Sequence, residues 1–230
     1  MKKIGIVGGL GPESTLEYYK ILVKKYNQIK GGVASPALII ESLDLQAVSD
    51  LMKNNEWDQV LTTMIQAANN LIAAGAQIII LATNSPHVIF DELEQQVSVP
   101  MISIMDATVQ EVQKAGLKRV GLLGTKYTMN GSFYPKTFGK YDIEIITPSP
   151  EDQEIIDEIL WKELVHRILE PESKKKYLAI IDKLQANGAE GIVLGCTEIP
   201  LLIKQKDCKI PVFDTTRIHA MAALSSALED

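Results

Sequence analysis

Three stretches of this 230-residue chain recur later in the same order and at nearly the same spacing. The matched pairs are residues 3–8 with 119–124 (offset 116), 74–86 with 187–199 (offset 113) and 99–107 with 210–218 (offset 111). One match could arise by chance among apolar strands, but three in order indicate an internal duplication. The sequence therefore predicts two similar halves related by a pseudo-twofold axis.

Each half alternates short apolar, β-branched runs with longer amphipathic stretches. Continuous apolar strands separated by helices are typical of a parallel sheet covered on both faces. We predict an α/β fold with two pseudo-symmetric domains, formed by residues 1–104 with 210–230 and by residues 105–209. The expected strands are residues 3–8, 36–42, 76–82, 99–104, 119–124, 142–148, 190–195 and 210–214, and the clearest helices are residues 57–74, 152–169 and 174–187.

Composition excludes several classes of function. The formal net charge is −6, so there is no basic excess to neutralise a nucleic-acid backbone. No segment approaches the roughly 20 apolar residues of a membrane span. The two cysteines, Cys196 and Cys208, match neither a disulfide framework nor a zinc motif. We expect a cytoplasmic protein with no metal, no membrane and no nucleic acid among its partners.

In parallel sheets, function lies at the carboxyl ends of the strands. Here those ends read GGLGPEST (residues 8–15), TNSPH (83–87), GTKYTM (124–129) and CTEIP (196–200). Small, hydroxyl and amide residues of this kind predict a pocket in which backbone N–H groups hold an anion. The glycine loop fits neither a Walker motif nor a dinucleotide fingerprint, which disfavours a nucleotide. Ser14 and Thr15 could equally cap the following helix.

The second of these strand ends carries Thr83, Asn84 and Ser85, followed by Pro86, a residue suited to the first turn of a helix. Asn84 and Ser85 would then lie near a positive helix N-terminus, ready to bind a carboxylate. A capped turn without a ligand is the simpler alternative. We expect His87, inside the helix, to be structural rather than catalytic.

The sharpest signal is Cys196, which ends an apolar strand just before a helix start. Such a position is expected to lower the pKa of a thiol and yield a usable thiolate. A buried, inert cysteine is the ordinary alternative, but the matching position in the other half of the repeat favours a function. Cys208 lies in a polar segment, and we interpret it as incidental.

These four motifs, in order and over essentially the whole length, resemble the aspartate/glutamate racemase family that works without pyridoxal phosphate. The resemblance implies two pseudo-symmetric α/β domains with the substrate in the cleft between them, no cofactor and a homodimer. Family members use two cysteines on opposite faces of the substrate Cα atom. The corresponding positions here are Thr83 and Cys196, so the first thiol is replaced by a hydroxyl.

The resemblance also implies roles for other residues. Cys196 would remove the Cα proton, with the L-enantiomer favoured, and Thr83 would relay a proton on the other face, for example through water. A threonine hydroxyl is a far weaker acid than a thiol, whose pKa is about 8.5. The remaining implied substrate contacts are Asn84, Ser85, Thr197, Thr125, Thr128 and Gly9.

The group that would bind the distal end of the substrate is not evident. Lys126, Lys162 and His166 are candidates, and aspartate, glutamate or another substrate stays open. Two other functions also stay open. A decarboxylase of the arylmalonate type needs a single cysteine, and a catalytically silent amino-acid-binding protein could keep the same pocket.

Overall fold

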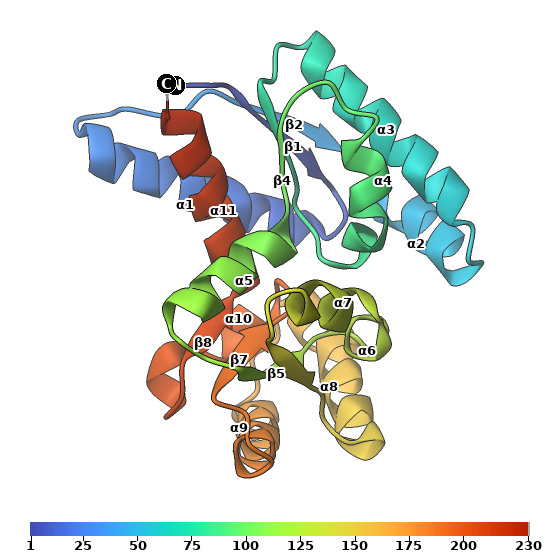
Figure 1. Cartoon of the computed structure of the whole chain (residues 1–230), viewed down its shortest axis with the longest axis vertical. Coiled ribbons are helices and arrows are strands. Elements are labelled where there is room, and N and C mark those ends of the chain that lie inside the picture. Colours follow the sequence, from blue (N-terminus) through green and yellow to red (C-terminus); the bar gives the residue numbers. More distant parts are fainter. Residues whose placement is uncertain (230) are drawn as a thin grey trace. The chain divides into compact units, whose positions relative to one another are not determined.

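The computed structural model describes residues 1–229 and forms two compact units (Figure 1). Unit 1 contains Met1–Ile104 and the residues from Thr216 on, and unit 2 contains Met105–Thr215. Within the described residues each unit has a four-stranded parallel sheet. The α/β fold with two parallel sheets predicted from the sequence is therefore confirmed.

In unit 1 the chain alternates between strands and helices, with a two-helix connection before the third strand. Its elements are β1 (Ile4–Gly8), α1 (Pro12–Lys30), β2 (Leu38–Ser42), α2 (Leu45–Lys53), α3 (Trp57–Ala73), β3 (Ile78–Leu81), the 3-10 helix η1 (Ser85–Ile89), α4 (Phe90–Glu94), β4 (Met101–Ile102) and most of α11 (Thr215–Leu228).

The sheet of unit 1 has the strand order β2-β1-β3-β4 and is covered on both faces. Alternate residues of β3 point to opposite faces. Ile78 and Ile80 pack with α1 and α11. Ile79 and Leu81 pack with α2, α3 and α4. The face of α3 predicted to be apolar, from Val60 to Leu71, is buried in this second layer.

In unit 2 the alternation of strands and helices recurs, with two helices between the first two strands in place of one. The elements of unit 2 are α5 (Ile104–Lys114), β5 (Arg119–Leu123), α6 (Lys126–Asn130), α7 (Phe133–Gly139), β6 (Glu144–Ile146), α8 (Pro150–Lys162), the 3-10 helix η2 (Leu164–His166), α9 (Pro171–Ala186), β7 (Gly191–Leu194), α10 (Ile199–Leu202), the 3-10 helix η3 (Gln205–Asp207) and β8 (Val212–Asp214).

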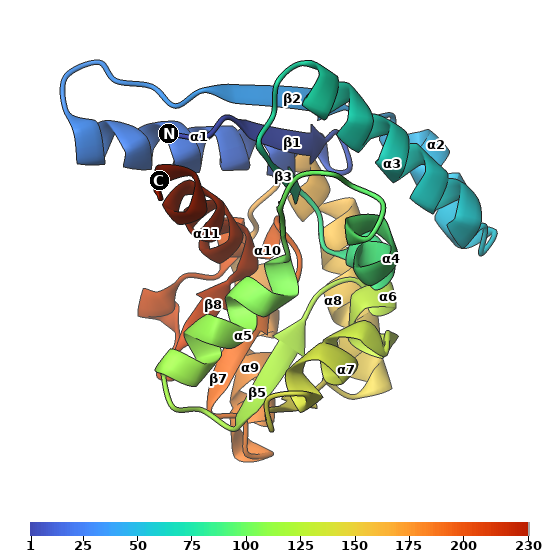
Figure 2. The ribbon, with the colours of Figure 1, turned by 45° about the horizontal axis from the view of Figure 1, so that its top comes forward.

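The strand order in unit 2 is β6-β5-β7-β8. Helices α8 and α9 cover one face, with Ile156, Tyr177 and Ile180 against Leu123 and Ile192. Figure 2 shows α8 and α9 behind the strands and α5 in front of them.

Residues 210–215, expected in the first domain, belong to unit 2, because β8 pairs with β7.

The strand registers match between the two sheets. In unit 1, Val7 of β1 pairs with Leu81 of β3; in unit 2, Leu123 of β5 pairs with Leu194 of β7. These partners differ by 116 and 113 positions, the offsets of the sequence repeat. A register slip of one residue would exchange the two faces of a strand. Identical registers therefore support the duplication.

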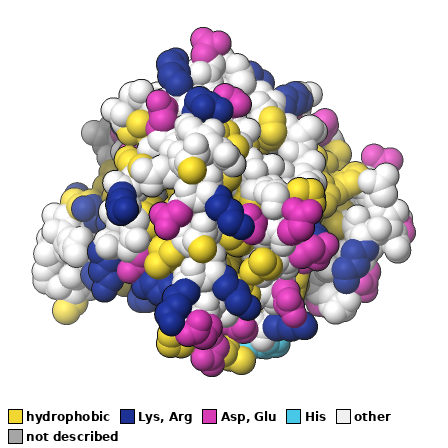
Figure 3. Space-filling model, turned by 90° about the horizontal axis from the view of Figure 1, so that it is seen from below, with side chains coloured by type: hydrophobic (Ala, Val, Ile, Leu, Met, Phe, Trp, Pro, Cys, Tyr) yellow, Lys and Arg dark blue, Asp and Glu magenta, His cyan; other side chains and the backbone are white. Residues whose placement is uncertain are grey.

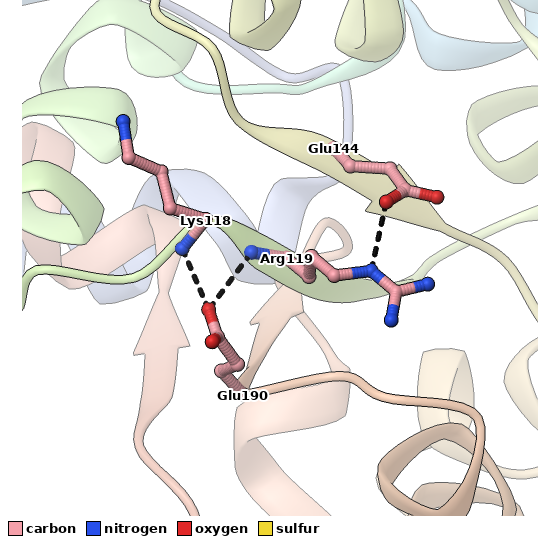
Figure 4. Close-up of polar contacts among 4 residues, drawn as sticks. All are labelled: Lys118, Arg119, Glu144 and Glu190. Carbon is pink, nitrogen blue, oxygen red and sulfur yellow. Dashed lines mark hydrogen bonds and ion pairs between the residues drawn. The ribbon is translucent and has the colours of Figure 1, made fainter.

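The amino ends of the sheets repeat as well. In unit 2, Glu190 Oε2 accepts from the backbone N–H groups of Lys118 and Arg119 at 2.6 and 3.0 Å, and the Arg119 side chain binds Glu144 (Figure 4). In unit 1 the same position is Gln77, whose Oε1 accepts from Lys3 N at 3.0 Å. A side-chain oxygen thus ties the central strands together in both units.

One predicted helix ends earlier than expected. Residues 152–169 were expected to form one helix, but α8 ends at Lys162. Glu163 leaves the helical region at φ −123°, and Arg167 closes η2 in the left-handed conformation at φ 59°. Leu164, just after the break, is buried in the same core as α8. The apolar pattern of the sequence therefore runs on past the end of the helix.

Candidate active site at the strand ends

The turn after β3 carries Thr83, Asn84 and Ser85. Thr83 and Asn84 are 8% and 6% exposed, and Ser85 is half-buried. The expected α-helix is instead the five-residue 3-10 helix η1, and the Asn84 side chain does not cap it. The positive N-terminus of a full α-helix is therefore missing at this point. The groups of the turn that can bind a carboxylate are its side-chain hydroxyl and amide groups and its backbone N–H groups.

The loop after β1 fastens α1 to the sheet. Ser14 Oγ donates to the Ala82 carbonyl at 2.7 Å, and Thr15 Oγ1 accepts from Gly9 N at 2.9 Å. Both residues lie inside the first turns of α1, so neither is the cap of that helix. Gly9 has φ 79°, and a Cβ atom there would lie 2.1 Å from the Leu43 carbonyl oxygen. Only glycine fits, and its N–H is already used by Thr15.

Cys196 lies two residues beyond β7 and belongs to a compact polar group. Its Sγ donates to Glu198 Oε2 at 3.0 Å, and Thr197 Oγ1 donates to the same oxygen at 2.7 Å. Cys196 and Thr197 are half-buried, whereas Glu198 is 8% exposed. One buried carboxylate oxygen thus accepts hydrogen bonds from both the thiol and the hydroxyl. Sequence reasoning assigned no role to Glu198, although it stands in the same motif, two residues after the cysteine.

The electrostatics of this group correct the expectation of an acidic thiol. Burial raises the pKa of Cys196 well above its usual value, and the negative charge of Glu198 raises it further. The backbone N–H groups of Thr197 and Glu198 act in the opposite direction. The following helix, α10, has only four residues, so little dipole is available to offset the carboxylate. At neutral pH the proton stays on the thiol, which donates a hydrogen bond to Glu198.

Two buried tyrosines lie near Cys196. A thiolate at Cys196 contributes to a raised pKa at both Tyr134 and Tyr177, although burial is the larger cause in each case. Tyr177 donates its hydroxyl to the Ile156 carbonyl at 3.2 Å. Tyr134 contacts Thr215, which donates to the Leu194 carbonyl at 2.8 Å. Both phenols stay protonated at neutral pH; Tyr177 is tied to α8, and Tyr134 is linked through Thr215 to the end of β7.

The predicted hydroxyl contacts Thr125 and Thr128 are partners of each other. Thr125 is the N-cap of α6, and its Oγ1 accepts from Thr128 N at 3.2 Å and lies 3.1 Å from Thr128 Oγ1. Thr128 is 1% exposed and packs on Gly124 and Gly195, at the ends of β5 and β7. Its burial makes Thr128 a support for the strand end that precedes Cys196, while Thr125 stays half-buried.

The repeat assigns Thr83 and Cys196 to equivalent positions. Ala82 N donates to the Val7 carbonyl at 2.9 Å, and Gly195 N donates to the Leu123 carbonyl at 2.7 Å. Each hydrogen bond joins the residue after the third strand to the end of the first strand of its sheet. Thr83 and Cys196 are the next residues along the chain. Each therefore leaves its own sheet at the same point.

The three cationic candidates for a distal carboxylate have different settings. Lys126 forms an ion pair with Glu154, and Lys162 binds Glu158 at 2.6 Å on the surface of α8. His166 is exposed in η2. The two lysines are therefore already matched by acidic partners, and the geometry singles out none of the three.

The surface gives further limits. On the face shown in Figure 3, Lys and Arg side chains alternate with Asp and Glu, so neither sign dominates it. Within residues 1–229, three or more His, Cys, Asp or Glu side chains do not converge as a metal site would require. In the same part of the chain, every helix is too short or too polar to cross a bilayer.

Comparison with known proteins identifies the family of this chain. The sequence model of the family described as "Asp/Glu/Hydantoin racemase" matches residues 7–223. A broad specificity amino-acid racemase from Bacillus subtilis (strain 168) is 25% identical over 98% of both chains. Among solved structures, an aspartate racemase homologue from Pyrococcus horikoshii OT3 is 40% identical with a TM-score of 0.89, and a candidate Asp/Glu racemase from Yersinia pestis is 38% identical with a TM-score of 0.93. Both of these structures align over 100% of both chains. The chain described here belongs to the Asp/Glu/hydantoin racemase family.

Proposed function

We propose that this protein is a cofactor-independent amino-acid racemase acting on aspartate or glutamate, with the L-enantiomer favoured. The observation that carries the proposal is the hydrogen bond from Cys196 to Glu198 at the end of β7. A thiol beside a buried carboxylate can exchange its proton locally. The names of the relatives, which include amino-acid racemases and an aspartate racemase homologue, support the reaction class.

In this scheme Cys196 removes the Cα proton of the substrate. The thiol first passes its own proton to Glu198, and the resulting thiolate takes the proton from Cα. The electron pair of the broken C–H bond moves into the α-carboxylate, which gains negative charge. Backbone N–H groups and the Asn84 amide would stabilise that charge. A raised pKa makes the thiolate a stronger base once it forms, and Glu198 is the neighbouring group that can accept the thiol proton.

Thr83 would return a proton to the other face of Cα. Its hydroxyl is too weak an acid to act as a free alkoxide, so we propose that it works as a relay, with water as the proton source. This step requires Thr83 and Cys196 to reach opposite faces of one Cα atom. The repeat gives the two residues equivalent points at the ends of their own sheets.

We propose that Asn84, Ser85 and Thr197 bind the α-carboxylate, with Thr125 as a further contact. Thr128, which is 1% exposed, and Gly9, whose N–H binds Thr15, would act by shaping the loops. We also propose a cytoplasmic homodimer, as the family resemblance implies. Light scattering coupled to gel filtration measures the assembly, and a mass of one chain would contradict it.

The function is tested by Cα-hydrogen exchange in D₂O, followed by NMR with L-aspartate and L-glutamate. We expect the wild type to exchange at least one of them and Cys196→Ser to lose the exchange. Cys208→Ser is the matched control, since it removes the other thiol of the chain, and should keep full activity. Retained exchange in Cys196→Ser would exclude it as the base. Release of CO₂ from arylmalonates without amino-acid exchange would favour a decarboxylase instead.

A further inference from the structure

Unit 1 contains a buried network of two histidines and a tyrosine behind the Thr83–Ser85 turn. His87, from η1, is 2% exposed, and His219, from α11, is fully buried. Their rings lie 5.8 Å apart in an edge-on arrangement, and Phe90 stacks on His87 at 5.2 Å. The proposed catalytic scheme uses none of these side chains. Burying a polar ring costs folding free energy unless its nitrogens form hydrogen bonds with neighbouring groups.

The hydrogen-bond partners define where the protons lie. His219 Nε2 is 2.7 Å from the Ile102 carbonyl, which can only accept, so this nitrogen carries the proton. His219 Nδ1 therefore accepts from the Tyr18 hydroxyl at 2.7 Å. In His87 the situation is reversed. Nε2 is 3.2 Å from the backbone N–H of Ile104, so Nε2 accepts and Nδ1 carries the proton.

Both rings are neutral under ordinary conditions. Burial lowers the pKa of His219 to about 4. Burial also lowers the pKa of His87, and the nearby His219 lowers it further, whereas the backbone carbonyls of Thr83 and Asn84 oppose the shift. These two carbonyls belong to the turn that precedes η1. Because Nε2 is occupied by Ile104, the Nδ1–H group is the one available to them.

We propose that His87 is a positioning residue for the Thr83–Ser85 turn: Nε2 anchors it to the start of α5, and Nδ1–H holds the carbonyls of Thr83 and Asn84. Within residues 1–229, Nδ1 is buried and has no hydrogen-bond partner, while the backbone N–H of His87 donates to the Asn84 carbonyl at 3.0 Å. A buried ring donor beside this turn, on a residue already tied to it through the backbone, is the geometry on which the proposal rests. The proposal rests on the proposed function only in assigning the α-carboxylate to this turn.

Two substitutions of His87 test the contacts of its two ring nitrogens separately. His87→Asn places an amide N–H near the position of Nδ1 but reaches no acceptor toward Ile104. His87→Gln places an amide oxygen near Nε2 but lacks the donor toward the turn. Tyr18→Phe is the matched control, because it removes a hydrogen bond from the same network at His219, away from the turn. All three should lower thermal stability to a similar extent.

The first readout is the KM for Cα-hydrogen exchange of L-glutamate or L-aspartate. We expect His87→Gln to raise KM by about fivefold with a smaller change in kcat, since a lost hydrogen bond of about 1 kcal/mol corresponds to that factor. His87→Asn and Tyr18→Phe should stay within twofold of the wild type. Equal KM values in the Gln and Asn variants, or an equal rise in Tyr18→Phe, would overturn the proposal.

The second readout does not need activity. Amide hydrogen exchange of residues 83–88 reports the local stability of the turn in the unliganded protein. It should speed up in His87→Gln and stay unchanged in Tyr18→Phe. In His87→Asn only the Ile104 amide should exchange faster. If His87→Gln does not fold, the comparison of His87→Asn with Tyr18→Phe is sufficient to test the proposal. Faster exchange of residues 83–88 in His87→Asn would contradict the role of the donor. A protein without racemase activity would fail the first readout but could still pass the second.

Discussion

The thiol of Cys196 and the carboxylate of Glu198 lie 3.0 Å apart at the end of β7, and Thr197 donates to the same carboxylate oxygen. The equivalent position after β3 in the other unit is Ser85, which cannot accept a proton as a carboxylate does. The two halves of the duplication therefore differ by an acid–base pair, and not only by a thiol.

The first prediction concerns Glu198→Gln. This change removes the negative charge that helps raise the pKa of the Cys196 thiol, so that pKa should fall. In a Cys208→Ser background, the rate of alkylation by iodoacetamide should rise at pH 8, by about tenfold for each unit by which the pKa falls. Cα-hydrogen exchange should nevertheless decrease, because the thiol loses its proton acceptor. An unchanged alkylation profile would show that Glu198 and the thiol are not coupled.

The second prediction concerns the packing of the repeated glycines. A Cβ atom on Gly8 would lie 2.6 Å from Thr15 Cγ2, and one on Gly124 would lie 2.9 Å from Thr128 Cβ. Gly8→Ala and Gly124→Ala should each lower the free energy of unfolding by about 1–3 kcal/mol in urea titrations.

Gly139→Ala is the matched control for these two changes, because an added Cβ meets nothing within 4 Å there. It should leave stability unchanged or raise it slightly, since alanine favours helix α7. A Gly124→Ala variant as stable as the wild type would mean that Thr128 does not hold the ends of β5 and β7 together.

The strands were predictable from sequence because parallel sheets require continuous apolar runs, and all eight expected runs contain a strand among the described residues. The repeat offsets also predicted the equivalence of Thr83 and Cys196. The 3-10 geometry of Ser85–Ile89 was not predictable, since Pro86 suits the first turn of either helix type. The early end of α8 was missed for a similar reason, because Leu164 keeps the apolar pattern beyond the break.

The site was only partly predictable. Glu198 stands in the same motif as Cys196, yet only the turn geometry brings its carboxylate to the thiol. The contact between His87 and His219 joins residues 132 positions apart, as their numbers show, and nothing in the sequence around either histidine indicates it. The rise in the Cys196 pKa was missed because it depends on burial and on Glu198.

The third prediction concerns stability in acid. The folded-state pKa of His219 is about 4, whereas an unfolded histidine titrates near 6.5, so the unfolded chain binds the extra proton between these values. The free energy of unfolding should therefore fall as pH decreases from about 6.5 to about 4. This histidine contributes up to about 3 kcal/mol of that loss.

His219→Gln should show a smaller loss over the same pH range, measured by urea unfolding at several pH values. The variant keeps an amide donor for the Ile102 carbonyl but cannot titrate. His166→Gln, a change at an exposed histidine, is the matched control. A pH dependence in His219→Gln equal to that of the wild type would contradict the assignment.

Only the Cys196 side should carry a strong base, and a comparison of Cα-hydrogen exchange with inversion tests this most directly. Each enantiomer of the better substrate is incubated in D₂O, and Cα–deuterium and optical inversion are followed together by NMR and chiral chromatography. Because enantiomers have equal free energies, kcat/KM for inversion must be equal in both directions. We predict that the L-enantiomer exchanges its Cα hydrogen faster than it inverts, while the D-enantiomer exchanges slowly. Comparable exchange of both enantiomers would contradict a single strong base at Cys196.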